Sequence, residues 1–212
     1  MKIIPAFTSC LEKLISYCLP LAFVLRKYYR PIVQREVRLG EIKENDDVLC
    51  IGGGALPWTA IEIAVQTGAK VYVVDCDQIA VLRASKLIKL LNLENLVKVC
   101  KGDGQSIDVS PYSVAHIALQ AAPQETILSH LLEKGRCNAR ILMRCPKKGI
   151  SCFYGKTCNT QCFCTDSISQ SFSTMKSTLL FVKPSTGGYF EYEKNSIFTN
   201  RDLTCLPLRV ER

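Results

Sequence analysis

The sequence is short of the features that mark the more specialised classes of protein. It has no internal repeat, no low-complexity segment and no block of consecutive basic residues. These absences exclude a repeat architecture and a disordered chain. The net charge is nevertheless +8, which favours an anionic partner such as nucleic acid, an anionic membrane face or an anionic cofactor. Because charge alone is weak evidence, nucleic acid is disfavoured as a partner without being excluded.

The sequence also lacks an apolar run long enough to cross a bilayer. Residues 14–25 are apolar, but Pro20 interrupts them and two basic residues follow. A transmembrane helix needs roughly 20 apolar residues, and a signal peptide needs a small-residue cleavage site that is missing here. We therefore expect no transmembrane segment. We expect two helices instead, over residues 8–18 and 20–37, as a helical N-terminal cover comprising residues 1–40.

Paired C-x-x-C motifs are absent, although the chain has twelve cysteines. A secreted domain held by disulfides is usually shorter and has fewer long apolar strands, so the cysteines indicate a reducing, cytoplasmic compartment. Four cysteines lie inside apolar runs and are expected to be buried, as small hydrophobic residues: Cys50, Cys76, Cys100 and Cys145.

A further group of cysteines is close in sequence, at Cys152, Cys158, Cys162 and Cys164. Four thiolates in one loop could hold zinc or an iron–sulfur cluster. Their spacing is uneven, however, and lacks the tight pairs of a familiar zinc site. We therefore expect no bound metal, and interpret this segment as a loop beside the substrate or as plain reduced cysteines.

What the sequence does have is a regular alternation of strands and helices. Its composition, with 48% hydrophobic and 22% charged residues, is typical of a globular domain with a sizeable core. The predicted strands cover residues 48–51, 69–75, 97–103, 113–120 and 139–145, and the predicted helices cover 56–66, 78–93 and 126–135. The helix over 78–93 is amphipathic, and its large apolar residues fall broadly on one side: Ile79, Leu82, Leu87 and Leu90.

This alternation predicts an α/β fold over residues 41–212. Residues 177–194 differ, because they read as two strands joined by a Pro-Ser-Thr-Gly-Gly turn, which predicts an antiparallel hairpin. The expected architecture is Rossmann-like and doubly wound. It has a mostly parallel seven-stranded sheet, a C-terminal antiparallel hairpin and the N-terminal helical cover.

A glycine turn follows the first predicted strand, in the stretch IGGGALPWT. Ligands of open α/β sheets bind beyond the carboxyl ends of the strands, and glycine lets a ligand approach the backbone. A dinucleotide fingerprint would need a third glycine where Pro57 stands, so S-adenosylmethionine fits better than NAD. Its amino-acid part would contact Gly52, Gly53, Gly54 and Leu56, at the start of the next helix.

Polar residues follow three further strands. Asp75 ends the second strand, where a carboxylate can accept bonds from both ribose hydroxyls, although its spacing also suits NAD. Asp103 follows the third strand in a turn near the adenine edge, and Gln120 ends the fourth. With the neighbouring residues, the predicted cofactor contacts in these turns are Asp75, Cys76, Asp103, Gly104 and Gln120.

Taken together, the turns resemble those of the class I methyltransferases that use S-adenosylmethionine, over residues 46–125, and the hairpin extends the resemblance. The glycine turn is also similar to the GSGPLPLT turn of the nicotianamine synthases, although Ala55 and Trp58 depart from it. That second resemblance implies transfer of the aminocarboxypropyl group to an amine instead of transfer of the methyl group. The matching residues are Gly52, Gly54, Leu56, Pro57 and Thr59.

The first expectation for function is therefore a methyltransferase acting on a small molecule. The alternatives are an aminocarboxypropyl transferase and a cofactor-binding module without catalysis. The Asn- or Asp-Pro-Pro-Tyr run of enzymes that methylate base or glutamine amines is absent, which disfavours those substrates. Residues 28–36 precede the first strand and could cover the cofactor, so Tyr29 and Glu36 are the candidate catalytic residues. Neither the acceptor nor the oligomeric state follows from the sequence.

Overall fold

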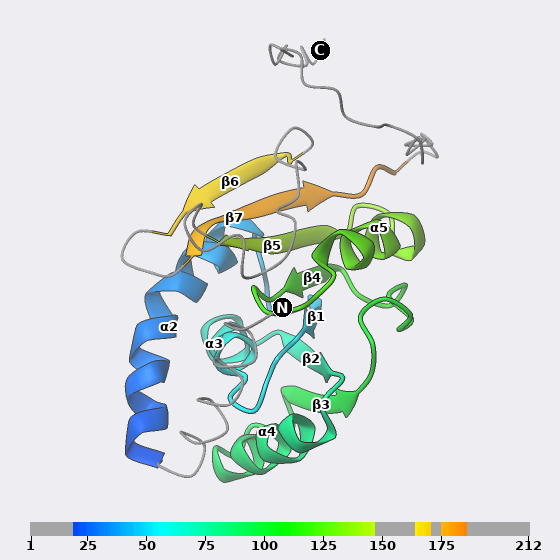
Figure 1. Ribbon diagram of the computed structural model, residues 1–212. Coiled ribbons are helices and arrows are strands. Elements are labelled where there is room, and N and C mark those ends of the chain that lie inside the picture. The colour runs from blue at the N-terminus through cyan, green and yellow to red at the C-terminus, as the bar shows by residue number, and fades with distance from the viewer. Residues whose placement is uncertain (1–18, 147–163, 171–174, 186–212) are drawn as a thin grey trace.

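The computed structural model describes residues 19–146, 164–170 and 175–185 (Figure 1). Within these ranges the chain forms one seven-stranded sheet in the order β3-β2-β1-β4-β5-β7-β6. The helices are α2 (Leu19–Leu39), α3 (Trp58–Thr67), α4 (Gln78–Leu90) and α5 (Gln124–Lys134). The strands are β1 (Asp47–Ile51), β2 (Lys70–Asp75), β3 (Val97–Lys101), β4 (Val114–Ile117), β5 (Arg140–Pro146), β6 (Asp166–Ser169) and β7 (Met175–Val182).

The sheet is parallel from β3 to β5, and β7 runs antiparallel to β5 and β6. The expected Rossmann-like, mostly parallel sheet with an antiparallel hairpin is confirmed. The strand that the structure describes as the outer partner of β7 was not expected, however. The strand at 175–182 pairs with residues 166–169 before it, and these short, largely exposed residues gave no strand pattern. The partner expected after the Pro-Ser-Thr-Gly-Gly turn lies outside the described residues.

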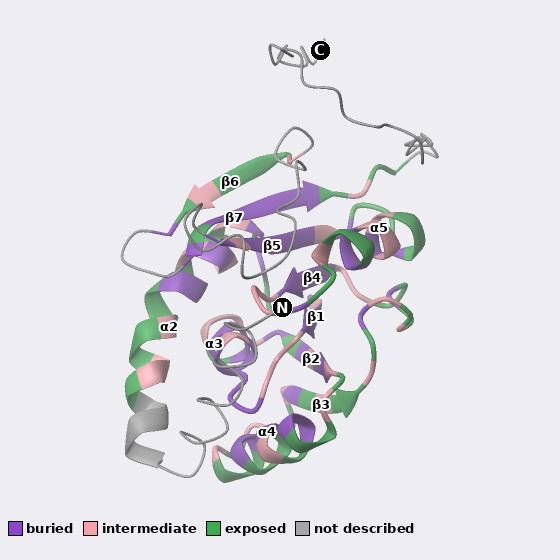
Figure 2. Cartoon of the chain, in the orientation of Figure 1, coloured by how far each residue is buried: buried purple, intermediate pink, exposed green. Residues whose placement is uncertain are grey.

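Both faces of the central strands are covered, which explains their nearly continuous apolar sequences. In β1, Val48 and Cys50 pack with α2, α3 and α4, whereas Leu49 and Ile51 pack with α5 on the other face. The buried residues in Figure 2 accordingly follow the sheet and the helix sides that face it. Among the described helices, three therefore cover one face and α5 covers the other.

The packed side of α4 is not the one that its large apolar residues suggested. The residues that face the sheet are Ala80, Val81, Ala84, Leu87 and Ile88. Of the four residues that were expected to share one side, only Leu87 is buried, and the other three are more than half exposed. Small alanines let the helix lie close to the sheet, so the contact uses the narrower side chains and leaves the larger ones in solvent.

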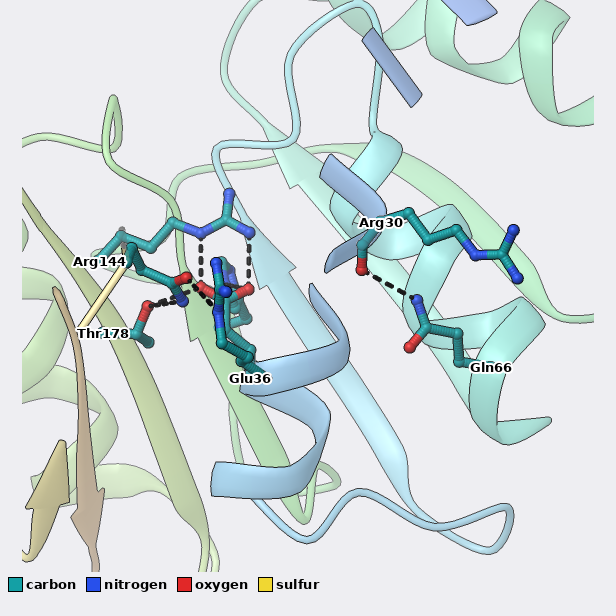
Figure 3. Close-up of polar contacts among 8 residues, drawn as sticks. Arg30, Glu36, Gln66, Arg144 and Thr178 are labelled. Carbon is teal, nitrogen blue, oxygen red and sulfur yellow. Dashed lines mark hydrogen bonds and ion pairs between the residues drawn. The ribbon is translucent and has the colours of Figure 1, made fainter. Parts of the chain in front are cut away.

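The described part of the N-terminal cover is α2, which runs through Pro31 to Leu39. The first expected helix, over residues 8–18, lies outside the described residues. A partly buried ion pair joins α2 to α3, since Nε of Arg26 lies 2.6 Å from Oε1 of Glu62. Gln66 reinforces this contact by donating a hydrogen bond to the carbonyl oxygen of Arg30 at 3.5 Å (Figure 3). No helix among the described residues combines the length and the apolar content that crossing a bilayer requires.

The cysteines within the apolar runs are less uniformly buried than expected. Cys50 is buried, and burial raises the pKa of its thiol to about 12. Cys145 is partly buried, but Cys76 and Cys100 are exposed. Cys76 follows the last residue of β2 and Cys100 lies on the edge strand β3, so neither position is enclosed by a second layer.

Candidate functional site

The glycine turn lies where β1 ends, between the ends of β2 and β4. Gly52 and Gly54 both have positive φ, at 79° and 66°, a conformation that a residue with a side chain rarely adopts. The N–H of Gly52 donates to the carbonyl oxygen of Val74 at 2.8 Å. A Cβ at Gly52 would also lie 3.0 Å from Cβ of Ala121, in the turn after β4. The turn is thus held by its two neighbouring strands.

Gly53 has a packing role. A Cβ at this position would lie 2.2 Å from Cγ1 of Val73 in β2. That contact is closer than any real side chain allows, so Gly53 lets the turn lie directly against the neighbouring strand. The spacing of the glycines predicted a ligand contact and gave no indication of this packing role.

The glycine turn leads to a pair of contrasting substitutions. Gly53→Ala is expected to destabilise the fold because of the contact with Val73, by about 1–3 kcal/mol as for other overpacked sites. Gly54→Val is expected to abolish binding of an S-adenosyl ligand, because a branched side chain at positive φ distorts the turn. Thermal unfolding and titration calorimetry measure the two effects. If Gly54→Val keeps both its stability and its affinity for S-adenosylhomocysteine, the turn does not contact the ligand.

Asp75 connects the end of β2 to the glycine turn. Its Oδ2 accepts a hydrogen bond from the N–H of Gly54 at 2.8 Å, and its Oδ1 accepts one from the N–H of Asp77 at 2.9 Å. An ionised carboxylate has about four lone-pair sites, so each oxygen keeps capacity for a further donor. The side chain is only partly buried. It therefore has the capacity to hold the turn and accept hydroxyl groups at the same time.

The next turn places Asp103 and Gly104 beside the end of β1. A Cβ at Gly104 would lie 2.4 Å from Cγ2 of Ile51, so this turn also packs closely. The carboxylate of Asp103 is exposed and accepts a hydrogen bond from the N–H of Gln105 at 2.9 Å. Strands β2 and β3 pair with Asp75 opposite Lys101. The turns that carry Asp75 and Asp103 are therefore neighbours at the carboxyl ends of the strands.

The remaining predicted contacts lie around this edge. Gln120 is partly buried in the turn after β4, Leu56 is buried before α3, and Cys76 is exposed beside Asp75. Gln124 braces the same turn, since its Nε2 donates to the carbonyl oxygens of Ala118 and Arg144 at 2.9 and 3.1 Å. The structure thus gathers the predicted residues at the ends of four adjacent strands. Their contacts with a cofactor stay a prediction.

A buried ionic cluster surrounds Glu36 on the face covered by α2 (Figure 3). Arg144 donates two hydrogen bonds to the carboxylate, from Nε at 2.8 Å and from Nη2 at 2.6 Å. Thr178 in β7 donates a third at 2.7 Å, and Nε2 of His116 lies 3.3 Å from Oε2. Glu36, Arg144 and His116 are each less than 5% exposed. The cluster joins α2 to three strands.

The electrostatics of this cluster favour a charged pair beside a neutral histidine. Burial raises the pKa of Glu36, but the Arg144 guanidinium outweighs it and holds that pKa well below its usual range. Burial lowers the pKa of Arg144, and Glu36 more than reverses this. Burial also lowers the pKa of His116, and the nearby Glu36 only partly offsets the effect. His116 is therefore neutral at neutral pH.

These contacts change the interpretation of the two candidate catalytic residues. Glu36 does not face solvent, and its carboxylate oxygens already accept hydrogen bonds from Arg144 and Thr178. Tyr29 is partly buried, and its ring centroid lies 5.6 Å from the guanidinium carbon of Arg144. Arg144 and Thr178 were missed from the sequence. The one indication was Arg144 after the apolar run Ile141–Met143, since a buried arginine requires an acidic partner.

No three histidine, cysteine, aspartate or glutamate side chains cluster as metal ligands in the part of the chain that the structure describes. Three of the four clustered cysteines, Cys152, Cys158 and Cys162, lie outside the described residues. The absence of a bound metal therefore stays a prediction.

Comparison with known proteins gives a context for this geometry. No family model matches the chain. An RNA methyltransferase from Salinibacter ruber, solved in complex with S-adenosyl-L-homocysteine, has a TM-score of 0.60 and 18% identity, and the match covers 74% of this chain and 93% of that one. A structure of MtNAS, a nicotianamine synthase, in complex with MTA and tNA has a TM-score of 0.67. It is 23% identical, and the match covers 82% of this chain and 69% of that one.

The chain has the Rossmann-like methyltransferase fold. The glycine turn and the two acids, Asp75 and Asp103, suggested a resemblance to the class I methyltransferases. The comparisons confirm this resemblance for the fold. One curated relative is also similar in sequence, the L-histidine 2-aminobutanoyltransferase of Yersinia pestis, with 29% identity over 112 residues. The match covers 53% of this chain, which spans less than half of the relative's length, 42%.

Proposed function

We propose that the chain binds S-adenosylmethionine and transfers its aminocarboxypropyl group to the amine of a small molecule. Cofactor binding is supported by the glycine turn, which Asp75 ties to the end of β2. The choice of transferred group rests on the sequence relative, whose name states transfer of a 2-aminobutanoyl group, and on the fold match to MtNAS. A 2-aminobutanoyl group has the four-carbon skeleton of the amino-acid part of S-adenosylmethionine.

The residues at the carboxyl ends of the strands fit the parts of this cofactor. No side chain caps the N-terminus of α3, and its first turn has no acidic residue, so its positive end suits a carboxylate. Gly52, Gly53 and Gly54 present backbone beside that end. Asp75 would accept bonds from the ribose hydroxyls, and Asp103 with Gly104 would lie at the adenine edge. The remaining predicted contacts are Leu56, Cys76 and Gln120.

When bound, the cofactor supplies a sulfonium whose adjoining carbons are electrophilic. The chain's task is to align an acceptor amine and remove its proton. Glu36 is proposed to orient the acceptor amine, because Arg144 keeps its carboxylate ionised but holds its pKa too low for an effective proton acceptor. For contact with an amine, that carboxylate must exchange one of its present donors, and Thr178 is the uncharged one. Tyr29, which lies against Arg144, is proposed to contact the acceptor.

Methyl transfer is the second candidate, because the match to the Salinibacter ruber methyltransferase covers 93% of that chain. A binding module without catalysis is the third. The compartment is proposed to be the cytosol. Four cysteines in the described ranges, Cys50, Cys76, Cys100 and Cys137, are free thiols, as a reducing compartment requires.

Product analysis distinguishes these functions. Incubation with S-adenosylmethionine and L-histidine, and then with a mixture of other amino acids, is expected to release methylthioadenosine. Release of S-adenosylhomocysteine would indicate methyl transfer. Binding of S-adenosylmethionine in calorimetry without either product would indicate a binding module. Binding of NAD with no response to either S-adenosyl compound would contradict the cofactor assignment itself.

A further inference from the structure

The outer side of α4 combines exposed aliphatic and basic residues. Ile79, Leu82 and Leu90 are 52%, 54% and 57% exposed. At 100° per residue they fall on one half of the helix, opposite the alanines that contact the sheet. The basic residues of α4 fall on that same half, at Arg83, Lys86 and Lys89. Figure 2 shows this outer surface as exposed along the length of the helix.

The charge of this surface is strongly one-sided. The helix QIAVLRASKLIKL contains three basic residues and no acidic one. The neighbouring edge strand β3 adds Lys98 and Lys101, both exposed. Asp77, which caps the helix by accepting a hydrogen bond from the N–H of Ile79, lies just before its first residue. A partner for this surface must therefore combine negative charge with an apolar layer.

We propose that the outer side of α4 is a peripheral binding surface for anionic lipid membranes. A lipid surface offers phosphate and carboxylate groups to the lysines and acyl chains to the three aliphatic residues, at adjacent depths. A second copy of this chain fits less well, because a two-fold contact would bring six like charges of the two helices together. Nucleic acid also fits less well, because this side of α4 has no aromatic residue on which bases could stack.

The position of α4 gives this surface a consequence for the site. The helix begins at Gln78, three residues after Asp75. Contact through α4 would therefore place the carboxyl ends of the strands, which carry the candidate site, close to the lipid headgroups. The cytosolic leaflet is the anionic one in cells, which agrees with the proposed compartment. The surface does not depend on which group the chain transfers.

Vesicle sedimentation tests the proposal with the full chain. Vesicles of equal parts phosphatidylcholine and phosphatidylserine are expected to bind the protein at low salt. Vesicles of phosphatidylcholine alone, or high salt, should release it. The double variants Leu82→Ser/Leu90→Ser and Lys86→Glu/Lys89→Glu should each bind about tenfold more weakly or less. Circular dichroism checks that both remain folded, as expected for exposed positions.

Two matched controls separate α4 from the rest of the surface. Val65→Ser removes a half-exposed aliphatic residue from α3, and Lys70→Glu/Lys176→Glu makes the same charge change on exposed lysines of β2 and β7. Both should bind vesicles like the wild type. The proposal is overturned if the wild type ignores the anionic vesicles, or if both α4 variants bind normally. It is also overturned if Leu82→Ser/Leu90→Ser converts a dimer to a monomer, since a second copy would then cover the surface.

Discussion

Replacing Arg144 with methionine is expected to lower the free energy of unfolding by about 3–5 kcal/mol, because removing one partner of a buried ion pair leaves the other charge uncompensated. Glu36 has no exposed surface, and Arg144 supplies two of its three closest donors. Urea denaturation measures the loss. Arg144→Lys keeps the charge without the two-pronged geometry and should lose less. Lys134→Met, which breaks the exposed pair with Glu133, should change stability very little.

The pH dependence of the Arg144→Met variant gives a separate signature. In the wild type the lowered pKa of Glu36 adds stability above its ordinary value of 4.5, and this is lost only as pH falls below that value. Without Arg144, only the weaker contacts with His116 and Thr178 oppose the effect of burial, so the pKa of the carboxyl should rise. The variant should then lose stability as pH rises through that raised pKa. The difference in unfolding free energy between the variant and the wild type should therefore become smaller at acid pH. A deficit that stays constant with pH would show that Glu36 does not carry the effect.

Replacing Asp75 with alanine is expected to weaken S-adenosylmethionine binding at least about tenfold, since each hydrogen bond to a charged group is worth about 1.5–3 kcal/mol. The carboxylate has two proposed roles, which are to accept the ribose hydroxyls and to hold the N–H of Gly54. Asp75→Asn retains one acceptor oxygen, so its affinity for the ligand should lie between those of Asp75→Ala and the wild type. Calorimetry with S-adenosylhomocysteine measures all three affinities without turnover.

Asp77→Ala is the matched control for Asp75. It removes an equal carboxylate two residues away, which caps α4 by accepting a hydrogen bond from the N–H of Ile79. It should cost roughly 1 kcal/mol of stability and leave the ligand affinity unchanged. Equal affinities for the wild type and Asp75→Ala would show that Asp75 only organises the turn. Equal losses in the Asp75 and Asp77 variants would point to a general effect on the loop.

The elements near the candidate site could be predicted because their patterns are local. Short β-branched runs ending in glycine or aspartate identified β1, β2 and β3 and placed their turns at one edge of the sheet. Gly68 ends α3 in the left-handed conformation, with φ of 77°, which glycine adopts readily. These features depend on a few adjacent residues, so no knowledge of distant contacts was needed.

The failures all depend on partners far away in sequence. The large side chains of α4 suggested the wrong side, because which side packs depends on how closely the helix approaches the sheet. β6 is short and polar, and only its pairing with β7 makes it a strand. The buried ion pair of Glu36 was not foreseen, because its partner Arg144 is 108 positions away. Periodicity within one element contains no information about such pairs.

The same separation has a consequence for the order in which the chain can fold. During synthesis, Glu36 leaves the ribosome long before Arg144. Thr178 emerges later still, 142 positions after Glu36. Until those residues emerge, closing α2 onto the growing sheet would bury a lone carboxylate, which is strongly unfavourable. Stable docking of α2 on the sheet therefore has to follow the formation of β5 and β7. Nascent chains of this protein should expose the sheet face beneath α2 during most of translation, a period when such a surface is open to chaperones.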